Sequence, residues 1–539
     1  MKPILLIFPP YDGKSVLVSR PPFPIGLLYI AAYLREREIA SEIIDFSYPH
    51  IRRRVETPEA ITKQGGITRW SRYGWSDLQI IMWLRRNLHH FHSTIGVSSL
   101  MSSNYPGFYK VIKFIKSVNK DTTVIGGGPH ATAEPDHVFR NTPVDLLCIG
   151  EGEEAFYNLL VGREHEAIVD RQTKKIAQRQ AFITDMDSLP FPDRDLLKDT
   201  RKLKELYITF SRGCPHKCSF CGSYKIQGRR WRHKSVGRAF KELEFYHKEW
   251  GINKFIVEDD NLTPGKVGIR WMKELCQKII EGLPKLRFRI SHGIPVYASA
   301  DKELCDLMWK AGFRKMVFPL ESTNPETLKH MNKSGTPENW KKGIKNWSYE
   351  KAHPTEIIIG YPFVETIESM LQTLIDISKQ RCKSWASHFR LHRGIPLYQQ
   401  CLDAGYINKS YDTLNASTFF IETERWNIKE LKEIMRISKA LNFGIEQDFD
   451  GVTDDPYKPI NGFQIVEGVE LREGNVIGDG KFKFKRSQNV FAGILIQRIW
   501  NLKGKPKITY SKDNTQLIYM GEERNRVYRI LEELIKKEG

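Results

Sequence analysis

The sequence of 539 residues lacks any apolar run that could cross a membrane. Its longest uninterrupted apolar segments, such as Val490–Ile496, fall far short of the ~20 residues that a transmembrane helix requires. The apolar stretch Ile4–Phe8 near the N-terminus is also short and has no small-residue cleavage site after it, which is typical of a strand and not of a signal peptide. We therefore expect a cytoplasmic protein without a membrane span.

Cysteine is scarce. Eight cysteines in 539 residues are too few for a disulfide scaffold, which again suits a reducing compartment. Three of them stand close together, and the other five are scattered without the spacing of metal ligands: Cys148, Cys276, Cys305, Cys382 and Cys401. The hydrophobic fraction of 40% is ordinary for a globular protein of several domains.

Acidic residues are in deficit. Sixty-four Asp and Glu face 83 Lys and Arg, which gives a formal net charge of +19. Such a charge favours an anionic partner, and basic residues concentrate at 225–234 and 481–486. No nucleic-acid-binding module accompanies the charge, so we do not expect a nucleic acid as partner; a diffuse, solubilising charge is the simpler interpretation.

The three clustered cysteines are the most informative feature that is present. Cys214, Cys218 and Cys221 follow the apolar run Leu206–Phe210 in Cys-x3-Cys-x2-Cys spacing. A cubane iron–sulfur cluster takes four ligands, so three thiolates would leave one iron open for a small molecule. Two other interpretations stay open, namely a zinc site with His216 as fourth ligand, and cysteines that are close by accident or form a disulfide.

This loop resembles the signature of the radical S-adenosylmethionine (SAM) enzymes. The strand before it, the Arg212-Gly213 pair and the aromatic Phe220 between the last two cysteines all match that pattern. The resemblance implies that the three cysteines hold a [4Fe–4S] cluster whose open iron binds SAM. It further implies that an electron from an external ferredoxin- or flavodoxin-like donor splits SAM to a 5′-deoxyadenosyl radical. No second group of cysteines supports an auxiliary cluster.

The first 165 residues alternate short aliphatic runs with amphipathic stretches, such as 24–38 and 105–118. This alternation predicts a doubly wound parallel sheet, Rossmann-like, which binds ligands beyond the carboxyl ends of its strands. The expected strands are Ile4–Phe8, Ser41–Phe46, Thr94–Ser98, Thr123–Gly126 and Asp145–Ile149.

The loops after these strands are rich in Gly, Pro and Ser, and as a set they resemble the cobalamin-binding domain that precedes many radical SAM domains. The Asp-x-His-x-x-Gly motif, which supplies a histidine to cobalt in many cobalamin proteins, is missing, as it commonly is in that subfamily. Tyr105 can approach the lower face of cobalt or simply pack at a helix start. The residues that the resemblance implies for cobalamin binding are Pro10, Ser98, Ser99, Met101, Tyr105, Gly127, Gly128, Pro129, His130, Glu151 and Gly152.

Residues 201–400 again alternate strands and helices, which predicts a partial (β/α)6 TIM-like barrel. The expected strands are Leu206–Ser211, Lys254–Glu258, Leu286–Ile290, Met316–Leu320, Glu356–Gly360 and Trp385–Leu391. Polar residues follow the strands, where barrels place their chemistry. The resemblance implies contacts to SAM or the cluster from Phe220, Glu258, Asp259, Asp260, Ser291 and Glu321.

Simpler roles stay open beside these. The acidic run 258–260 can cap a strand end, and His292 can be a structural histidine. Gly360-Tyr361-Pro362 with Glu365-Thr366 is similar to the family's Gly-x-Pro-Gly-Glu-Thr, but Phe363-Val364 replaces one glycine. The local backbone is therefore expected to differ from that of the family.

The expected organisation is a cobalamin-binding domain at 1–165, a linker at 166–200, a radical SAM domain at 201–400 and an α+β extension at 401–539 that shapes substrate access. Within the extension we expect helices at 427–441 and 522–537 and strands at 481–485 and 507–511. Trp426 and Trp500 are expected in the core.

The resemblance implies a cobalamin-dependent radical SAM methyltransferase that methylates an unactivated carbon, occasionally phosphorus. The adenosyl radical would abstract hydrogen and methylcobalamin would donate the methyl group. A peptide or protein side chain is the preferred substrate class, and a small metabolite or lipid the other. Cyclisation or carbon–carbon coupling without methyl transfer is the alternative reaction. A tRNA methylthiotransferase would need three more cysteines upstream, where Cys148 stands alone, and an intact cysteine loop argues against a non-enzymatic cobalamin sensor.

Overall fold

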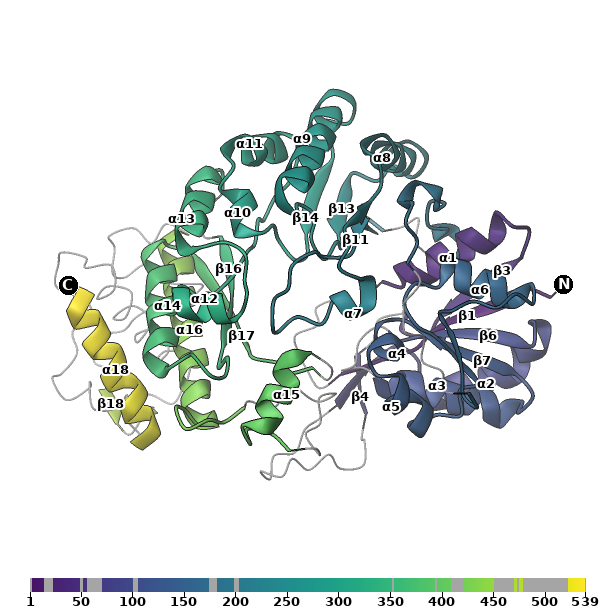
Figure 1. Ribbon diagram of the computed structural model, residues 1–539, viewed down its shortest axis with the longest axis horizontal. Coiled ribbons are helices and arrows are strands. Elements are labelled where there is room, and N and C mark those ends of the chain that lie inside the picture. The colour runs from purple at the N-terminus through teal and green to yellow at the C-terminus, as the bar shows by residue number, and fades with distance from the viewer. Residues whose placement is uncertain are drawn as a thin grey trace.

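The computed structural model has two sheet-based halves side by side, with the N-terminus and the C-terminus at opposite ends (Figure 1). The residues that it describes are 2–13, 23–48, 52–55, 70–99, 105–173, 182–197, 203–350, 353–392, 395–408, 421–449, 470–472, 475–477 and 522–538. Within these residues, no helix is both long and apolar enough to cross a membrane.

The first half is built on a six-stranded sheet with the order β3-β1-β6-β7-β8-β9. The first five of these strands run parallel and β9 runs antiparallel at the edge. The bounds are β1 Ile4–Phe8, β3 Ser41–Asp45, β6 Thr94–Ser98, β7 Thr123–Gly127, β8 Leu146–Cys148 and β9 Ile168–Asp170. The predicted doubly wound parallel sheet is therefore confirmed, and the antiparallel edge strand is an addition to it.

Helices cover both faces of this sheet because its central strand is apolar on both sides. In β1, Ile4 and Leu6 pack toward one layer of helices, while Leu5 and Ile7 pack toward the other. One layer consists of α1 Ile25–Arg35 and α6 Glu153–Leu160, and the other of α2 Asp77–Asn87, α3 Tyr105–Val118, α4 Pro129–Ala133 and α5 Pro135–Asn141. The chain reverses its winding between β1 and β6, which is the point where such sheets bind ligands.

A small antiparallel sheet that the sequence did not predict adjoins this half. Its strands are β2 Tyr11–Gly13, β5 Trp70–Tyr73 and β4 Arg52–Val55, in that order. It begins directly after the two prolines that end β1, so it lies at the ligand-binding edge of the large sheet.

The second half contains two three-stranded parallel sheets, β10-β13-β14 and β15-β16-β17. A parallel bridge between Phe288 and Phe313 joins them, which gives the partial barrel that the sequence predicts. The strands are β10 Leu206–Ile208, β13 Lys254–Val257, β14 Arg287–Ile290, β15 Phe318–Glu321, β16 Pro354–Ile359 and β17 Lys383–His388. The helices around them are α8 Val236–Trp250, α9 Gly265–Gly282, α10 Val296–Ser299, α11 Lys302–Lys310, α12 Pro325–His330, α13 Pro337–Asn346 and α14 Ile367–Lys379.

The first barrel strand differs from its prediction. The expected strand over 206–211 is split into β10 and a two-residue strand, β11 Ser211–Arg212, which pairs antiparallel with β12 Arg232–His233. The cause is Asp259, whose carboxylate accepts hydrogen bonds from the backbone N–H groups of Phe210 and Ser211 at 3.0 and 2.5 Å. These groups are thereby taken out of the strand ladder, and the chain turns away into the cysteine loop.

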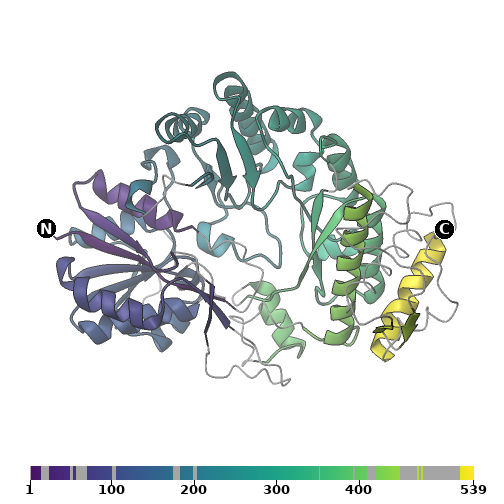
Figure 2. The same cartoon turned by 180° about the vertical axis from the view of Figure 1, so that it is seen from behind.

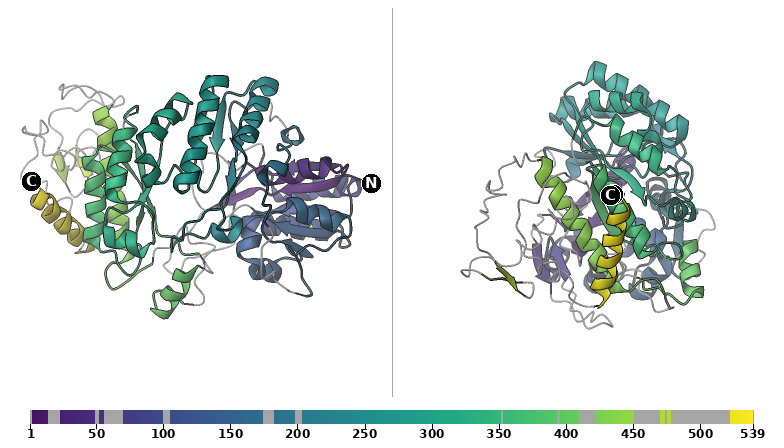
Figure 3. Two further views of the ribbon diagram at one scale, coloured as in Figure 1. Left: turned by 45° about the horizontal axis from the view of Figure 1, so that its top comes forward. Right: turned by 90° about the vertical axis from the view of Figure 1, so that its left-hand side faces the viewer.

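The C-terminal segment completes the outer helical layer of the barrel. Helix α16 Ile428–Phe449 packs on β17, where Asn442 Oδ1 accepts a hydrogen bond from Ser384 N at 2.7 Å, and α18 Glu522–Glu538 packs beside α14 and α16 (Figures 2 and 3). Both predicted helices are confirmed, and Trp426 is buried as expected. The described strands here are β18 Glu470–Arg472 and β19 Asn475–Ile477; the strands predicted at 481–485 and 507–511, and Trp500, lie outside the described residues.

Candidate active site

The cysteine loop is anchored at both ends. Gly213, just before Cys214, has φ 87°, and a Cβ atom there would lie 2.3 Å from the carbonyl oxygen of Arg230, so glycine is required for the close approach of the two chains. At the far side, Ser219 N donates to Met331 O at 2.9 Å, and the Ser219 and Tyr361 hydroxyls lie 2.7 Å apart.

The three cysteines are partly buried and belong to one loop. Burial raises the pKa of Cys214, and it raises the pKa of Cys218 to about 11, so the thiolates need a positive partner such as iron. Among the described residues, no group of three or more His, Cys, Asp and Glu converges as a single metal ion would demand. His216 Nε2 lies 3.0 Å from the Tyr297 hydroxyl instead. The cysteines suit a cluster, in which each ligates a different iron, better than zinc.

The acidic run after β13 divides into three different environments. Glu258 bonds with the Ser291 hydroxyl at the end of β14, so the structure brings these two predicted residues together. The Asp259 carboxylate accepts hydrogen bonds from Phe210 N, Ser211 N and the Ser211 hydroxyl, just before the cysteine loop. Burial raises the pKa of Asp259 to about 6. Asp260 has a buried Oδ2 without a hydrogen-bond partner in the described residues, as expected of a group that faces a bound ligand.

A second charged group lies beside the cysteine loop. Lys333 Nζ donates to Glu321 Oε1 at 2.6 Å and lies 5.8 Å from the ring centre of Phe220, which packs partly buried among apolar side chains. Burial and the neighbouring charge of Glu321 raise the pKa of Glu356 to about 7. Glu321 itself has φ 78°, which is uncommon for a residue with a side chain and occurs often at functional sites.

The loops at the carboxyl edge of the large sheet are tied together by Ser99. Its hydroxyl donates to Gly127 O at 2.8 Å and accepts from Ala131 N at 3.0 Å, while its carbonyl lies 2.5 Å from where a Cβ of Gly128 would stand. Gly128 has φ 92°, and Pro129 begins α4 directly after it. Ser98, Gly127 and Gly128 therefore form one small-residue edge that a flat ligand can approach closely.

Other residues predicted for cobalamin lie behind this edge. The carbonyl of Pro10 faces Gly107 of α3, where a Cβ would approach it to 2.2 Å. His130 is fully buried with its Nε2 3.1 Å from the Tyr109 hydroxyl, and burial lowers its pKa to about 3. Tyr105 packs beside both rings, as its simpler interpretation expected. Met101 lies outside the described residues.

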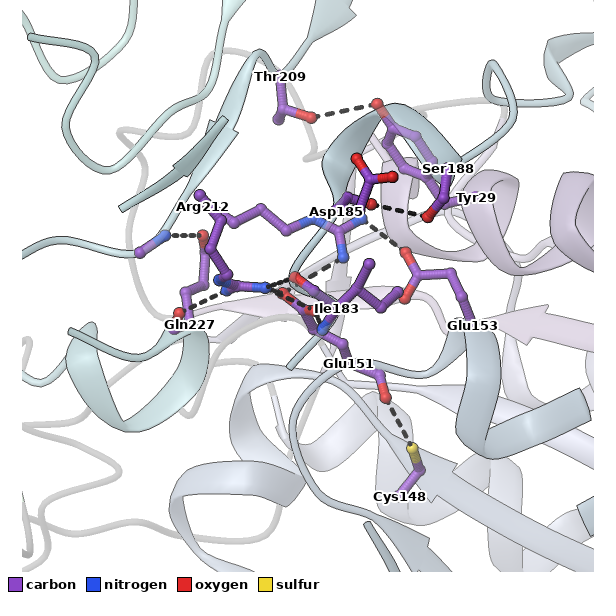
Figure 4. A network of polar contacts seen from close by, with 12 residues as sticks. Tyr29, Cys148, Glu151, Glu153, Ile183, Asp185, Ser188, Thr209, Arg212 and Gln227 are labelled. Atoms are coloured by element: carbon purple, nitrogen blue, oxygen red, sulfur yellow. Dashed lines mark hydrogen bonds and ion pairs between the residues drawn. The ribbon is translucent and has the colours of Figure 1, made fainter. Parts of the chain in front are cut away.

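The loop after β8 is bound to the second half by buried ion pairs. Arg212 donates to Glu153 Oε1 at 2.6 Å and lies 3.4 Å from Glu151 (Figure 4). Arg232 donates to both carboxylate oxygens of Glu151 at 2.8 Å. Burial disfavours the charge of Arg212, but Glu153 and Glu151 outweigh it and raise the pKa of Arg212. The Glu151 side chain is thus engaged by arginines, and Gly152 packs against Ile30.

Several residues of the site were not predicted in the roles that the structure gives them. Asn261, whose amide reaches Cys214, directly follows the acidic run 258–260, where the resemblance implied contacts to SAM and not to a sulfur atom. Lys333 and Glu356 are separated from the cysteines by more than a hundred residues, and neither belongs to a recognisable motif. Glu153 directly follows the predicted residues Glu151 and Gly152, but no feature of the sequence indicates that its side chain is buried.

Comparison with known proteins decides the family. Residues 208–377 match the Radical SAM superfamily and residues 89–160 match the B12 binding domain. The chain combines the two domains of the cobalamin-dependent radical SAM enzymes. Its cofactors are a [4Fe–4S] cluster, SAM and cobalamin, and it is a methyltransferase-like member.

Relatives of this radical SAM enzyme include methyltransferases. An uncharacterized methyltransferase of Pyrococcus horikoshii is 29% identical and aligns over 69% of this chain and 76% of its own. The cytidylyl-2-hydroxyethylphosphonate methyltransferase of Streptomyces wedmorensis is 24% identical over 72% and 79%. The solved structure of the cobalamin-dependent enzyme OxsB shares the fold, with a TM-score of 0.64 and 14% identity over 100% of this chain and 80% of its own. Further matches are named as anaerobic magnesium-protoporphyrin IX monomethyl ester cyclases.

Proposed function

We propose that this enzyme transfers a methyl group to an unactivated carbon, on a peptide or protein side chain. The observation that carries the proposal is the buried contact between Arg212, two residues before Cys214, and Glu151 and Glu153, directly after β8. It brings the cysteine loop beside the carboxyl edge of the doubly wound sheet. A hydrogen-abstracting centre and a methyl donor must be close neighbours for such a transfer.

When bound, the cluster with SAM supplies a 5′-deoxyadenosyl radical, and cobalamin supplies the methyl group. In this proposal Cys214, Cys218 and Cys221 hold the cluster. The end of β13 and β14, with Asp260, Glu258 and Ser291, orients SAM through polar contacts. The Ser99, Gly127 and Gly128 edge receives the corrin. His130 and Glu151 support these loops from behind and do not contact the cofactor through their side chains.

The same assignment divides the chain into functional regions. Residues 1–165 would bind cobalamin, 201–400 would carry the radical chemistry, and 166–200 would connect them. The described helices of the 401–539 region support the barrel from outside, so a role in substrate access would fall to other parts of that region. The net charge of +19 is compatible with a peptide or protein substrate but does not by itself select one.

The test uses anaerobically purified protein that is reconstituted with iron and sulfide and supplied with hydroxocobalamin, SAM and dithionite. We expect bound cobalamin in the visible spectrum and both 5′-deoxyadenosine and S-adenosylhomocysteine as products. Replacing Cys214, Cys218 and Cys221 together by Ala should abolish 5′-deoxyadenosine formation and leave the cobalamin spectrum intact. Cys276→Ala, a buried cysteine of α9, is the matched control and should keep both products.

Retained SAM cleavage in the triple variant would overturn the cluster assignment. Formation of 5′-deoxyadenosine without bound cobalamin would remove the methyl donor and favour cyclisation or carbon–carbon coupling. The substrate class is tested with SAM that carries a deuterated methyl group in an anaerobic extract. Label in digested peptides supports the proposal, and label confined to small molecules or lipids contradicts it.

A further inference from the structure

A hydrogen bond reaches one of the three loop sulfurs from a different element of the barrel. Asn261, in the loop between β13 and α9, points its side-chain Nδ2 at Cys214 Sγ from 3.6 Å. Hydrogen bonds to sulfur are longer than those to oxygen, and this one lies within their usual range. The residue is almost completely buried, with 5% of its surface exposed. Water therefore does not compete for the amide.

The orientation of the Asn261 amide is fixed by its neighbours. Its Oδ1 accepts a hydrogen bond from Thr263 N at 3.3 Å, and a backbone N–H can bond only to the oxygen end of the amide. The NH2 end must then face the sulfur. Tyr297 holds the same loop in place, because its hydroxyl accepts from Gly265 N at 3.1 Å and donates to Thr263 O at 3.2 Å.

The contacts of the other two sulfurs are different. Cys221 Sγ lies 3.5 Å from Ser223 Oγ, within the same loop, and Cys218 has the charge of Lys333 nearby. In the described part of the chain, the hydrogen bond from Asn261 is the one that reaches a loop sulfur from a residue outside the loop. Its donor is neutral, rigid and shielded from water, which makes it suited to a steady electrostatic effect.

We propose that Asn261 raises the reduction potential of the iron–sulfur cluster through its hydrogen bond to Cys214. This inference rests on the proposed function, in which Cys214 ligates iron. Reduction adds negative charge that is shared with the ligand sulfurs, so a donor at a sulfur stabilises the reduced cluster more than the oxidised one. Asn261 is a positioning residue, since it acts through Cys214 and not on SAM.

The experiment is a redox titration of the reconstituted full-length protein, followed by electron paramagnetic resonance of the reduced cluster. In Asn261→Leu the midpoint should move to a more negative potential. The ratio of reduced to oxidised cluster at the wild-type midpoint should fall roughly tenfold, the effect of one hydrogen bond to a charged group. Asn261→Asp keeps the size of the side chain and the acceptor for Thr263 N but loses the donor, so it should shift the midpoint in the same direction.

The matched control is Asn332→Asp. Asn332 Nδ2 donates to Lys217 O at 3.0 Å, so it contacts the same loop but no sulfur, and the substitution introduces the same charge. Its midpoint should stay closer to the wild type than that of Asn261→Asp. An unchanged midpoint in Asn261→Leu overturns the inference, as do equal shifts in the two Asp variants. If Asn261→Leu does not fold, the pair of Asp variants decides.

The outcome is separable from that of the proposed function. If the wild-type protein assembles no cluster with a reducible signal, or if the triple cysteine variant still assembles one, the assignment of Cys214 fails. If the cluster assembles on these cysteines but its potential is indifferent to Asn261, only the present inference fails.

Discussion

Two non-glycine residues near the carboxyl edge of the barrel adopt backbone conformations that favour glycine. Glu321 has φ 78° and Phe363 has φ 77°. Phe363 stands where the family motif has a glycine, and its backbone lies in the left-handed region that glycine adopts most easily. The Phe363 ring lies 5.3 Å from that of Tyr406 and 6.0 Å from that of His330. These ring contacts offset a conformational strain of about 1–3 kcal/mol.

At the same scale, the partly buried Glu356 makes stability depend on pH. Its pKa of about 7 exceeds the ordinary 4.5, so the folded state keeps a proton that the unfolded state releases. The wild type should therefore lose stability as pH rises from about 4.5 to 7. Glu356→Gln removes this loss. The difference in free energy of unfolding between the variant and the wild type should therefore be up to ~3 kcal/mol more favourable to the variant at pH 8 than at pH 4.5.

Urea unfolding of both proteins at the two pH values measures this difference. Glu338→Gln serves as control, because Glu338 is exposed at the start of α13 and its pKa is lowered, not raised. If the free energies of unfolding of Glu356→Gln and the wild type differ by the same amount at both pH values, the pKa of Glu356 is not raised in the folded protein.

At the scale of elements, the antiparallel pair of β11 and β12 binds the start of α6 through ion pairs. Arg212 and Arg232 are cross-strand partners, and their two guanidinium groups pair with Glu151 and Glu153. All four side chains are nearly buried, and two positive charges balance two negative ones. Each charge is therefore stabilised mainly by its partners and not by water. Removing one member leaves an uncompensated charge in a poorly hydrated place.

Arg212→Met should therefore lower the free energy of unfolding by about 3–5 kcal/mol. Adding Glu153→Gln should recover part of the loss, because the orphaned carboxylate disappears with it. A double-mutant cycle by urea unfolding measures the coupling, which we expect at roughly 1–3 kcal/mol. The exposed pair Lys248 and Glu244 on α8 is the control, with a coupling of about 0.3–0.5 kcal/mol. Equal couplings at the two pairs would contradict this account.

The sequence predicted the strands and helices of both sheets well because their signal is local. The five parallel strands of the first sheet and helix α3 were predicted nearly to the residue, since aliphatic runs and amphipathic periodicity are local signals. The break between β10 and β11 was missed because it depends on Asp259, nearly fifty residues away. The sheet of β2, β5 and β4 was missed for the same reason, as its strands are short and their pairing is non-local.

At the scale of the whole molecule, the sequence predicted which cofactors the chain uses but not how the two halves are joined. A ten-residue stretch from Arg212 to Cys221 carries the cluster signature, whereas the junction is assembled from scattered single residues. Lys234 Nζ donates to Tyr29 OH at 3.0 Å and to Thr209 O at 2.8 Å, and it pairs with Glu242. A buried lysine looks like any other lysine in a sequence, so such junctions become visible only in the fold.

This junction predicts how the protein responds to cobalamin. Buried ion pairs and hydrogen bonds join the two halves, so heating should unfold them in one transition. A ligand that binds only the folded state stabilises every part that unfolds together with its site. Hydroxocobalamin should therefore raise the midpoint of the single calorimetric transition in the protein without a cluster, although its proposed site lies in the first half.

The Arg212→Met variant provides the contrast, because it weakens the junction without changing the Ser99 and Gly128 edge. In this variant we expect two transitions, of which hydroxocobalamin shifts only the one that belongs to the first half. Fragments from limited proteolysis at each temperature identify the halves. A wild-type protein that already shows two transitions, one of them insensitive to hydroxocobalamin, would mean that the buried charges hold the halves in place without making them fold together.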